Sequence, residues 1–79
     1  MDQREFEDIR RALGISKAQL GRVLMLAHAS GYKTVHRMVI GDIPISGPVT
    51  RVMQALKSGW RPADYEACLR HEARHDAFA

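Results

Sequence analysis

Cysteine, aromatic residues and long apolar runs are all scarce in this chain of 79 residues. The single cysteine, Cys68, excludes a disulfide within the chain and a zinc site built from several cysteines, and it fits a reducing compartment. No apolar run approaches the roughly 20 residues that cross a bilayer, and no charged-then-apolar leader opens the chain. We therefore expect a soluble, cytoplasmic protein with no membrane partner.

The two-residue alternation of β-strands is also missing, as are internal repeats and low-complexity tracts. An apolar fraction of 46% argues against disorder. Residues 1–79 are therefore expected to make one small domain, near the lower limit for a self-sufficient hydrophobic core. Because small cores without disulfides or metals often gain stability by association, we expect a homodimer.

Acidic residues are scarce in the middle of the chain. The net charge is +3, from 12 basic and 9 acidic residues. Residues 25–58 carry four Lys or Arg and one acidic residue, Asp42. The flanking segments are close to neutral, with five basic and four acidic residues before this stretch and three basic and four acidic residues after it. A basic excess confined to one stretch favours an anionic partner such as nucleic acid.

The chain does contain apolar residues at helical spacing, and these predict five helices in one all-α domain. Asp2 can cap the first helix, which ends before Gly14. Ser16 can cap the second, which reaches about Ala27. Gly21 falls inside the second helix, where glycine costs about 1 kcal/mol relative to alanine. Close approach of another helix explains a glycine there, and a tolerated surface position is the alternative.

Three more helices follow a break at 27–31, which reads A-H-A-S-G. Their predicted ranges are about 32–40, 46–58 and 62–75. Trp60 lies between the last two, and we expect it to fold back onto the helical core. The third helix is amphipathic in an unusual way, because the face opposite its apolar residues is cationic. The residues predicted on that face are Tyr32, Lys33, His36 and Arg37. An anchored, cationic helix is what a nucleic-acid groove requires.

One motif in the last helix points elsewhere. Residues 71–75 read H-E-A-R-H and match the H-E-x-x-H pattern of zinc-protease helices. Catalysis would also require a third ligand held rigidly and a substrate cleft. We interpret the segment as a solvent-facing C-terminal helix, and we expect no enzyme activity and no cofactor. A fortuitous metal site on Cys68, His71 and His75, which share one helical face, stays open as an alternative.

Residues 6 to about 56 resemble a known family. The run at 6–24 reads F-x-x-I-R-x-x-L-G-I-S-K-x-x-L-G-x-x-L, and later runs read T-V-H-R-x-x-x-G at 34–41 and I-P-I-x-G-P at 43–48. Together they are similar to the first four helices of the lambda-repressor/Cro (XRE-type) helix-turn-helix family. Two features depart from it: the link between the second and third helices is about four residues longer, and Met38-Val39 stands where the family often has Trp-Glu.

The resemblance implies a five-helix domain in which the second and third helices form the helix-turn-helix, with the third in the major groove of DNA. It implies base contacts from Tyr32, Lys33, Thr34, His36 and Arg37. It implies phosphate contacts from Ser16, Lys17, Arg22 and Arg51. The fifth helix, which lacks the basic excess, is the expected dimer element. The residues expected in the dimer interface are Trp60, Tyr65, Cys68 and Leu69.

The expected function is therefore sequence-specific binding of double-stranded DNA by a homodimeric transcriptional regulator, most simply a repressor that reads an inverted repeat. Small repressors of phages or mobile elements are typical proteins of this kind. Some of them, such as the anti-CRISPR-associated regulators, autoregulate a neighbouring small operon. Two alternatives use the same scaffold. An antitoxin would devote the fifth helix to a protein partner, and a pure protein-interaction module would not bind DNA.

Overall fold

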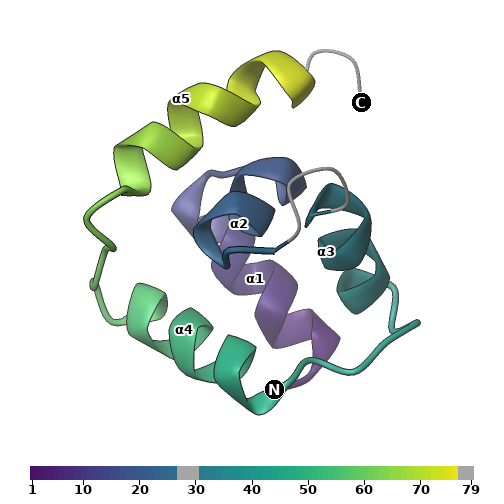
Figure 1. Ribbon diagram of the computed structural model, residues 1–79. Helices are drawn as coiled ribbons and strands as arrows, with labels where there is room; N and C mark the ends of the chain where they lie inside the picture. Colours follow the sequence, from purple (N-terminus) through teal and green to yellow (C-terminus); the bar gives the residue numbers. More distant parts are fainter. Residues whose placement is uncertain (27–30, 77–79) are drawn as a thin grey trace.

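The computed structural model describes residues 1–26 and 31–76, without the side chains of 71–76. Within this part of the chain every regular element is a helix (Figure 1), which confirms the predicted all-α, five-helix class. The helices are α1 (Gln3–Leu13), α2 (Lys17–Val23), α3 (Gly31–Val39), α4 (Gly47–Lys57) and α5 (Tyr65–Asp76). Of the predicted break at 27–31, residues 27–30 lie outside the described residues, and Gly31 begins α3. In 1–26 and 31–76, no helix is both long and apolar enough to cross a bilayer.

The first two helices begin at the predicted caps. The Asp2 carboxylate accepts a hydrogen bond of 2.7 Å from the Glu5 N–H at the start of α1. At the start of α2, the Ser16 hydroxyl accepts from the Gln19 N–H at 3.0 Å, while the Gln19 side chain accepts from the Ser16 N–H at 2.8 Å. This capping box satisfies two backbone donors that have no partner within a helix. The starts of both helices are therefore set by side chains that bond a backbone N–H three residues away.

The second helix ends at Val23, four residues before the predicted end at Ala27. The chain leaves the helix through two hydrogen bonds of 3.0 Å, from the Met25 N–H to the Arg22 carbonyl and from the Leu26 N–H to the Gly21 carbonyl. These two bonds form a Schellman motif, which requires a left-handed residue between them. Met25 is that residue, with a φ of 60°. The sequence did not indicate this end because glycine normally takes such a position.

α2 and α3 cross where both have glycine. A Cβ atom placed on Gly21 would lie 2.9 Å from the carbonyl carbon of Gly31, closer than real Cβ atoms approach. The backbones are in contact, so Gly21 has the close neighbour that its position in the helix predicted. This contact sets how near α3 lies to α2.

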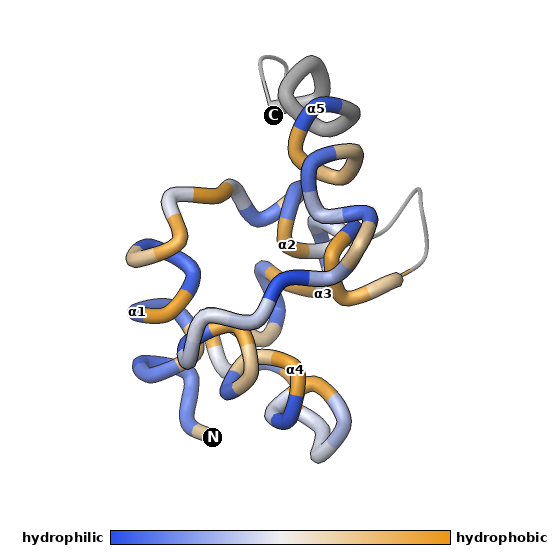
Figure 2. Tube along the Cα trace, turned by 90° about the vertical axis from the view of Figure 1, so that its left-hand side faces the viewer, coloured by the Kyte–Doolittle hydropathy of each residue, from blue (hydrophilic) through white to orange (hydrophobic). Residues whose placement is uncertain are grey.

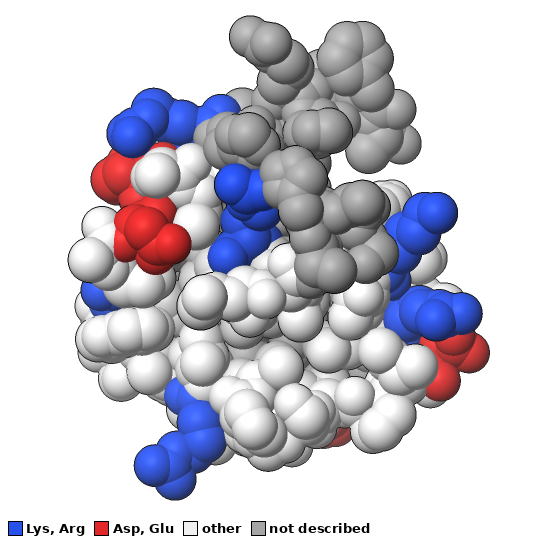
Figure 3. All heavy atoms as spheres, viewed as in Figure 1, with Lys and Arg blue, Asp and Glu red and all other residues white. Residues whose placement is uncertain are grey.

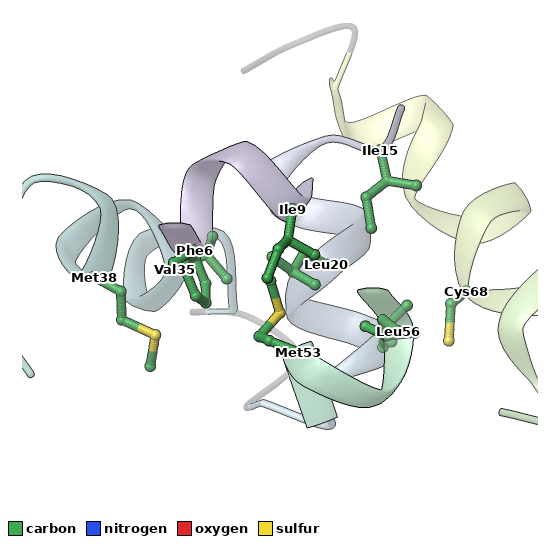
Figure 4. Close-up of a cluster of buried hydrophobic side chains, with 10 residues drawn as sticks. Phe6, Ile9, Ile15, Leu20, Val35, Met38, Met53, Leu56 and Cys68 are labelled. Carbon is green, nitrogen blue, oxygen red and sulfur yellow. The ribbon is translucent and has the colours of Figure 1, made fainter. Parts of the chain in front are cut away.

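The hydrophobic core joins all five helices. Its fully buried side chains come from the first four, and they are Phe6, Leu20, Val35, Met53 and Leu56. Figure 4 shows Met53 and Leu56 from α4 beside Ile9 and Leu20 from α1 and α2. Hydrophilic and hydrophobic residues follow each other at short intervals along the helices (Figure 2). Such a pattern is expected when one side of each helix is buried. In the packing, α3 lies against α2 and α1, α4 lies against α1, and α5 covers α2 (Figure 1).

The approach to α5 differs from its prediction in two ways. The helix begins at Tyr65, after a turn in which the Tyr65 N–H donates to the Pro62 carbonyl at 3.1 Å, and not at Pro62 itself. Trp60 does not fold back onto the core, because 48% of it stays exposed. The backbone N–H of Trp60 donates to the Ala55 carbonyl at 3.0 Å in the turn that ends α4.

Candidate nucleic-acid interface

The third helix has one buried stripe and, on its other side, two rows of polar side chains. Gly31, Val35 and Met38 are buried and hold the helix on α2 and α1. The opposite side carries the row Tyr32 and His36 and, next to it, the row Lys33 and Arg37. Residues four apart share one side of a helix, so each row presents its two side chains together. The structure thus brings four of the five predicted base-contacting residues onto one surface.

The first row is tied to α2. The Lys17 Nζ lies 2.9 Å from His36 Nδ1, and both groups are partly buried. On α3 itself, the rings of Tyr32 and His36 stack with an interplanar angle of 8° and a centroid separation of 6.3 Å. Sequence reasoning placed these three residues at a common interface but did not predict the contact between Lys17 and His36. Lysine at the start of one helix and histidine 19 positions later carry no local signal for such a pair.

The second row is cationic and more exposed. Lys33 is exposed and has no ion pair with another described residue. The Arg37 Nε lies 3.2 Å from the Asp42 carboxylate just beyond the end of α3, and both side chains are more than half exposed. Exposed ion pairs contribute only about 0–1 kcal/mol. Asp42 therefore orients Arg37 without holding it firmly against a stronger anion.

Two further residues, Thr34 in α3 and Ile40 just after its end, lie near these rows. Thr34, the fifth predicted base-contacting residue, is half-buried and lies beside the rows, not within them. Ile40 is 59% exposed, and its N–H still bonds the His36 carbonyl at 3.0 Å. Sequence reasoning did not assign Ile40 to the surface, although its position four residues after His36 would have indicated it. An exposed isoleucine at this place can contact an apolar group such as a thymine methyl.

The four predicted phosphate-contacting residues are not equivalent. The Ser16 hydroxyl oxygen is used as a hydrogen-bond acceptor in the capping box. Lys17 bonds His36, and Arg22 is half-buried and also has a partner. Arg51 is exposed on α4. On the face seen in Figure 3, Asp and Glu are confined to the edges and Lys and Arg stand both at the rim and near the centre. That face is therefore compatible with a polyanion.

The residues predicted for a dimer interface divide into two groups. Cys68 is buried in the core of its own chain, and Tyr65 and Leu69 pack partly against that core. The Leu69 carbonyl accepts a 3.0 Å hydrogen bond from the Gln19 side chain of α2. Cys68 therefore holds α5 to α2 and does not stand on a free surface. Trp60 is the member of the set that presents a large exposed apolar side chain.

The histidines of the H-E-x-x-H motif have side chains outside the described set, although the backbone of 71–75 is helical. Among the side chains that the structure describes, no three His, Cys, Asp or Glu residues gather at one place. Burial and the neighbouring Asp64 raise the pKa of the Cys68 thiol above its ordinary value. A raised pKa keeps this sulfur in the thiol form, which is a poor metal ligand.

A groove of about 490 Å³ lies between α1 and the C-terminal end of α4. Ile9, Leu13 and Leu56 contribute apolar surface, while Arg4 and Asp8 are among the charged residues that also line it. The charges are of both signs, so the groove has no preference for a polyanion. Arg4 thus provides a cation that lies apart from the surface of α3.

Comparison of the chain with family models, with curated proteins and with solved structures finds no match in any of the three.

Proposed function

We propose that this chain is a sequence-specific DNA-binding regulator of the lambda-repressor/Cro (XRE) type, and that α2 and α3 are its helix-turn-helix. The observation that carries the proposal is the two-rowed surface of α3. Its buried stripe fixes the helix, while Lys33, Arg37, Tyr32 and His36 project from the other side. A rigid helix with cations that can hydrogen-bond guanine O6 and N7 fits the major groove.

A solvated surface would also expose lysine and arginine, so further observations must separate the two interpretations. Lys17 reaches from α2 to the Tyr32–His36 row, which joins two helices into one polar surface. The backbone contact between Gly21 and Gly31 sets the spacing of those helices. Surface charges that serve only solubility need neither feature. The arrangement therefore supports a site whose geometry matters.

In the proposed mechanism, a homodimer places two α3 helices in successive major grooves, about 34 Å apart, on an inverted repeat. Occupation of a promoter would then block transcription, which makes the regulator a repressor. Trp60, exposed at the junction of α4 and α5, is the proposed centre of the dimer contact. An antitoxin would use the same exposed indole for a different protein, and that remains the second candidate.

Selection of bound duplexes from a random DNA pool tests the proposal. Wild type should select a motif with two half-sites in inverted orientation. Lys33→Ala and Arg37→Ala should each relax the base preference at a defined position, because a good pair of bonds to one base is worth about 1–3 kcal/mol of discrimination. Arg4→Ala removes the same charge from the α1–α4 groove, and it should leave the motif unchanged.

Two results would contradict the proposal. Absence of binding even at low salt would remove DNA as the partner, since the phosphate contribution does not depend on sequence. An identical motif from all four proteins would show that α3 does not read the bases. A motif with a single half-site would retain DNA binding but remove the dimer from the mechanism.

A further inference from the structure

The contact between Lys17 and His36 determines which ring nitrogen of His36 carries a proton. Lys17 is an ammonium with three donors and no acceptor. A hydrogen bond of 2.9 Å from its Nζ to His36 Nδ1 therefore requires Nδ1 to be an acceptor. A neutral imidazole with an acceptor at Nδ1 has its proton on Nε2. In this geometry, His36 is a neutral ring that presents an Nε2–H donor.

The orientation of the ring is restricted as well. Tyr32, one helical turn before His36, stacks on it with the two planes 8° apart. Nδ1 is directed toward α2 by Lys17, while Nε2 has no hydrogen-bond partner among the described residues. The His36 imidazole is thus held at Nδ1 by the hydrogen bond with Lys17 and contacted on one face by the Tyr32 ring. A side chain restrained in this way loses less entropy when it binds a ligand.

We propose that His36 is a ligand-binding hydrogen-bond donor of the α3 surface, and that Lys17 and Tyr32 are positioning residues that hold it in the Nε2–H form. Its ligand is a hydrogen-bond acceptor of nucleic acid, either on a base edge (guanine O6 or N7, adenine N7, thymine O4) or on a phosphate. The amino groups of adenine and cytosine are donors, so the same Nε2–H disfavours them at this position. The inference rests on the proposed DNA-binding function for the ligand, but not for the state of the ring.

The state of the ring is measured without DNA. Nitrogen-15 NMR of the imidazoles at about pH 8, where an ordinary imidazole is neutral, separates protonated from unprotonated ring nitrogens. The His36 signals are identified by their loss in His36→Gln. Wild type should show one form, with the proton on Nε2. Lys17→Met, which removes the donor and keeps an unbranched side chain, should show a mixture. Equal spectra for the two proteins, or a proton on Nδ1 in wild type, would overturn the proposal.

The ligand is tested with two substitutions that imitate one ring nitrogen each. Glutamine places its N–H₂ near the position of Nε2, whereas asparagine places its N–H₂ near Nδ1. On the duplex selected by wild type, His36→Gln should bind within about threefold of wild type and His36→Asn should lose about fivefold or more. Equal losses for the two variants would overturn the assignment of His36 as a donor.

The same duplex distinguishes the two sources of the acceptor. A 7-deazapurine removes N7, 2-aminopurine removes guanine O6, 5-methyl-2-pyrimidinone removes thymine O4, and a methylphosphonate neutralises one phosphate. The replacement at the true acceptor should weaken wild type and His36→Gln but add no further loss to His36→Asn. If no replacement weakens wild type and His36→Gln while leaving His36→Asn unaffected, the ligand assignment is wrong. If DNA binding is absent at low salt, the proposed function fails and the ligand assignment with it, while the NMR result still decides the state of the ring.

Discussion

At the scale of single residues, Met25 has the least favourable backbone conformation among the described residues. It is the non-glycine residue with a positive φ, at 60°, and its side chain is 88% exposed. For residues other than glycine, a left-handed conformation costs roughly 1–2 kcal/mol. Gly41 takes the equivalent position at the end of α3 without this cost, with a φ of 81°. The exposed methionine makes few contacts that could offset the cost.

Met25→Gly should therefore stabilise the protein. We expect the free energy of unfolding to rise by about 0.5–1 kcal/mol, since relief of the left-handed strain exceeds the added flexibility of the unfolded chain. Urea denaturation measures the change. Met25→Ala is the matched control, because it removes the same side chain and leaves the strain. If alanine stabilises the protein as much as glycine does, the effect comes from the side chain and the backbone argument is wrong.

At the scale of helices, Arg10 of α1 forms an ion pair within that helix and a hydrogen bond to the turn before α2. Arg10 donates to both carboxylate oxygens of Glu7, at 2.6 and 2.7 Å, and to the Ile15 carbonyl at 2.7 Å. The Glu7 side chain is only 14% exposed. The hydrogen bond from Arg10 lowers the pKa of Glu7 below its ordinary value, against the opposing effect of burial. The pair orients the turn that leads into the capping box of α2.

The lowered pKa of Glu7 predicts a pH dependence of stability. A carboxylate whose pKa is lower in the folded state stabilises the protein above its ordinary value of 4.5, and this contribution is lost as the pH falls through the folded-state value. Glu7→Gln should therefore lower the free energy of unfolding by about 1–2 kcal/mol at pH near 7. The difference from wild type should shrink as the pH falls below about 5.

Urea denaturation at several pH values measures this difference. Asp8→Asn is the control, because Asp8 is an exposed neighbour on the same helix that takes no part in the pair. It should change stability by no more than about 0.5 kcal/mol. A difference between Glu7→Gln and wild type that stays constant with pH would mean that packing, not charge, explains the loss.

The crossing of α2 and α3 gives a second prediction at this scale. Gly21→Ala should lower the free energy of unfolding by about 1–3 kcal/mol, because the new Cβ meets the Gly31 backbone at 2.9 Å and this clash exceeds the gain in helix propensity. Gly31→Ala should change it by less than about 1 kcal/mol. Its Cβ would have ordinary contacts of 3.5 Å or more. Thermal or urea denaturation measures the stability of both variants. A Gly21→Ala protein more stable than wild type would disprove the close contact.

At the scale of the whole molecule, the modest net charge of +3 is less informative than its placement. Arg51 on α4 is exposed, and it is the one predicted phosphate contact that has no partner in the part of the chain that the structure describes. Lys57, on the same helix, lies 3.9 Å from the Glu5 carboxylate and lines the α1–α4 groove. The α4 helix thus carries two cations: Arg51, which is proposed to contact DNA, and Lys57, which is directed toward α1.

If Arg51 contacts a phosphate, its loss should appear in the salt dependence of binding. Each neutralised phosphate contributes about −0.9 to the slope of log K against log salt for duplex DNA. Arg51→Gln should therefore make the slope less steep by about one, without changing the selected motif. Lys57→Gln removes an equal charge and should leave the slope unchanged. Equal effects from both variants would indicate that only the net charge matters, and that Arg51 has no specific contact.

Local signals in the sequence were sufficient to predict much of the fold. The caps at Asp2 and Ser16 were recognisable because each side chain bonds a backbone N–H only three residues away. Gly14 was recognisable as a helix end because glycine readily takes the left-handed conformation that follows a helix, and its φ is 70°. The end of α2 was predicted too late, since nothing in the sequence indicates that Met25 adopts a left-handed conformation. Trp60 was expected to fold back onto the core, but it follows the turn that ends α4 and is 48% exposed.

The candidate site shows the same division. The sequence by itself determined that the third helix has a buried stripe and a cationic side, since both follow from residue spacing within one helix. The tertiary structure decided that Lys17 bonds His36, that Arg37 is oriented by Asp42, and that Cys68 of α5 is buried in the core. Helix periodicity is a local property of a few consecutive residues. Contacts between helices depend on how closely their backbones approach, as at Gly21 and Gly31, and only the packed chain fixes that distance.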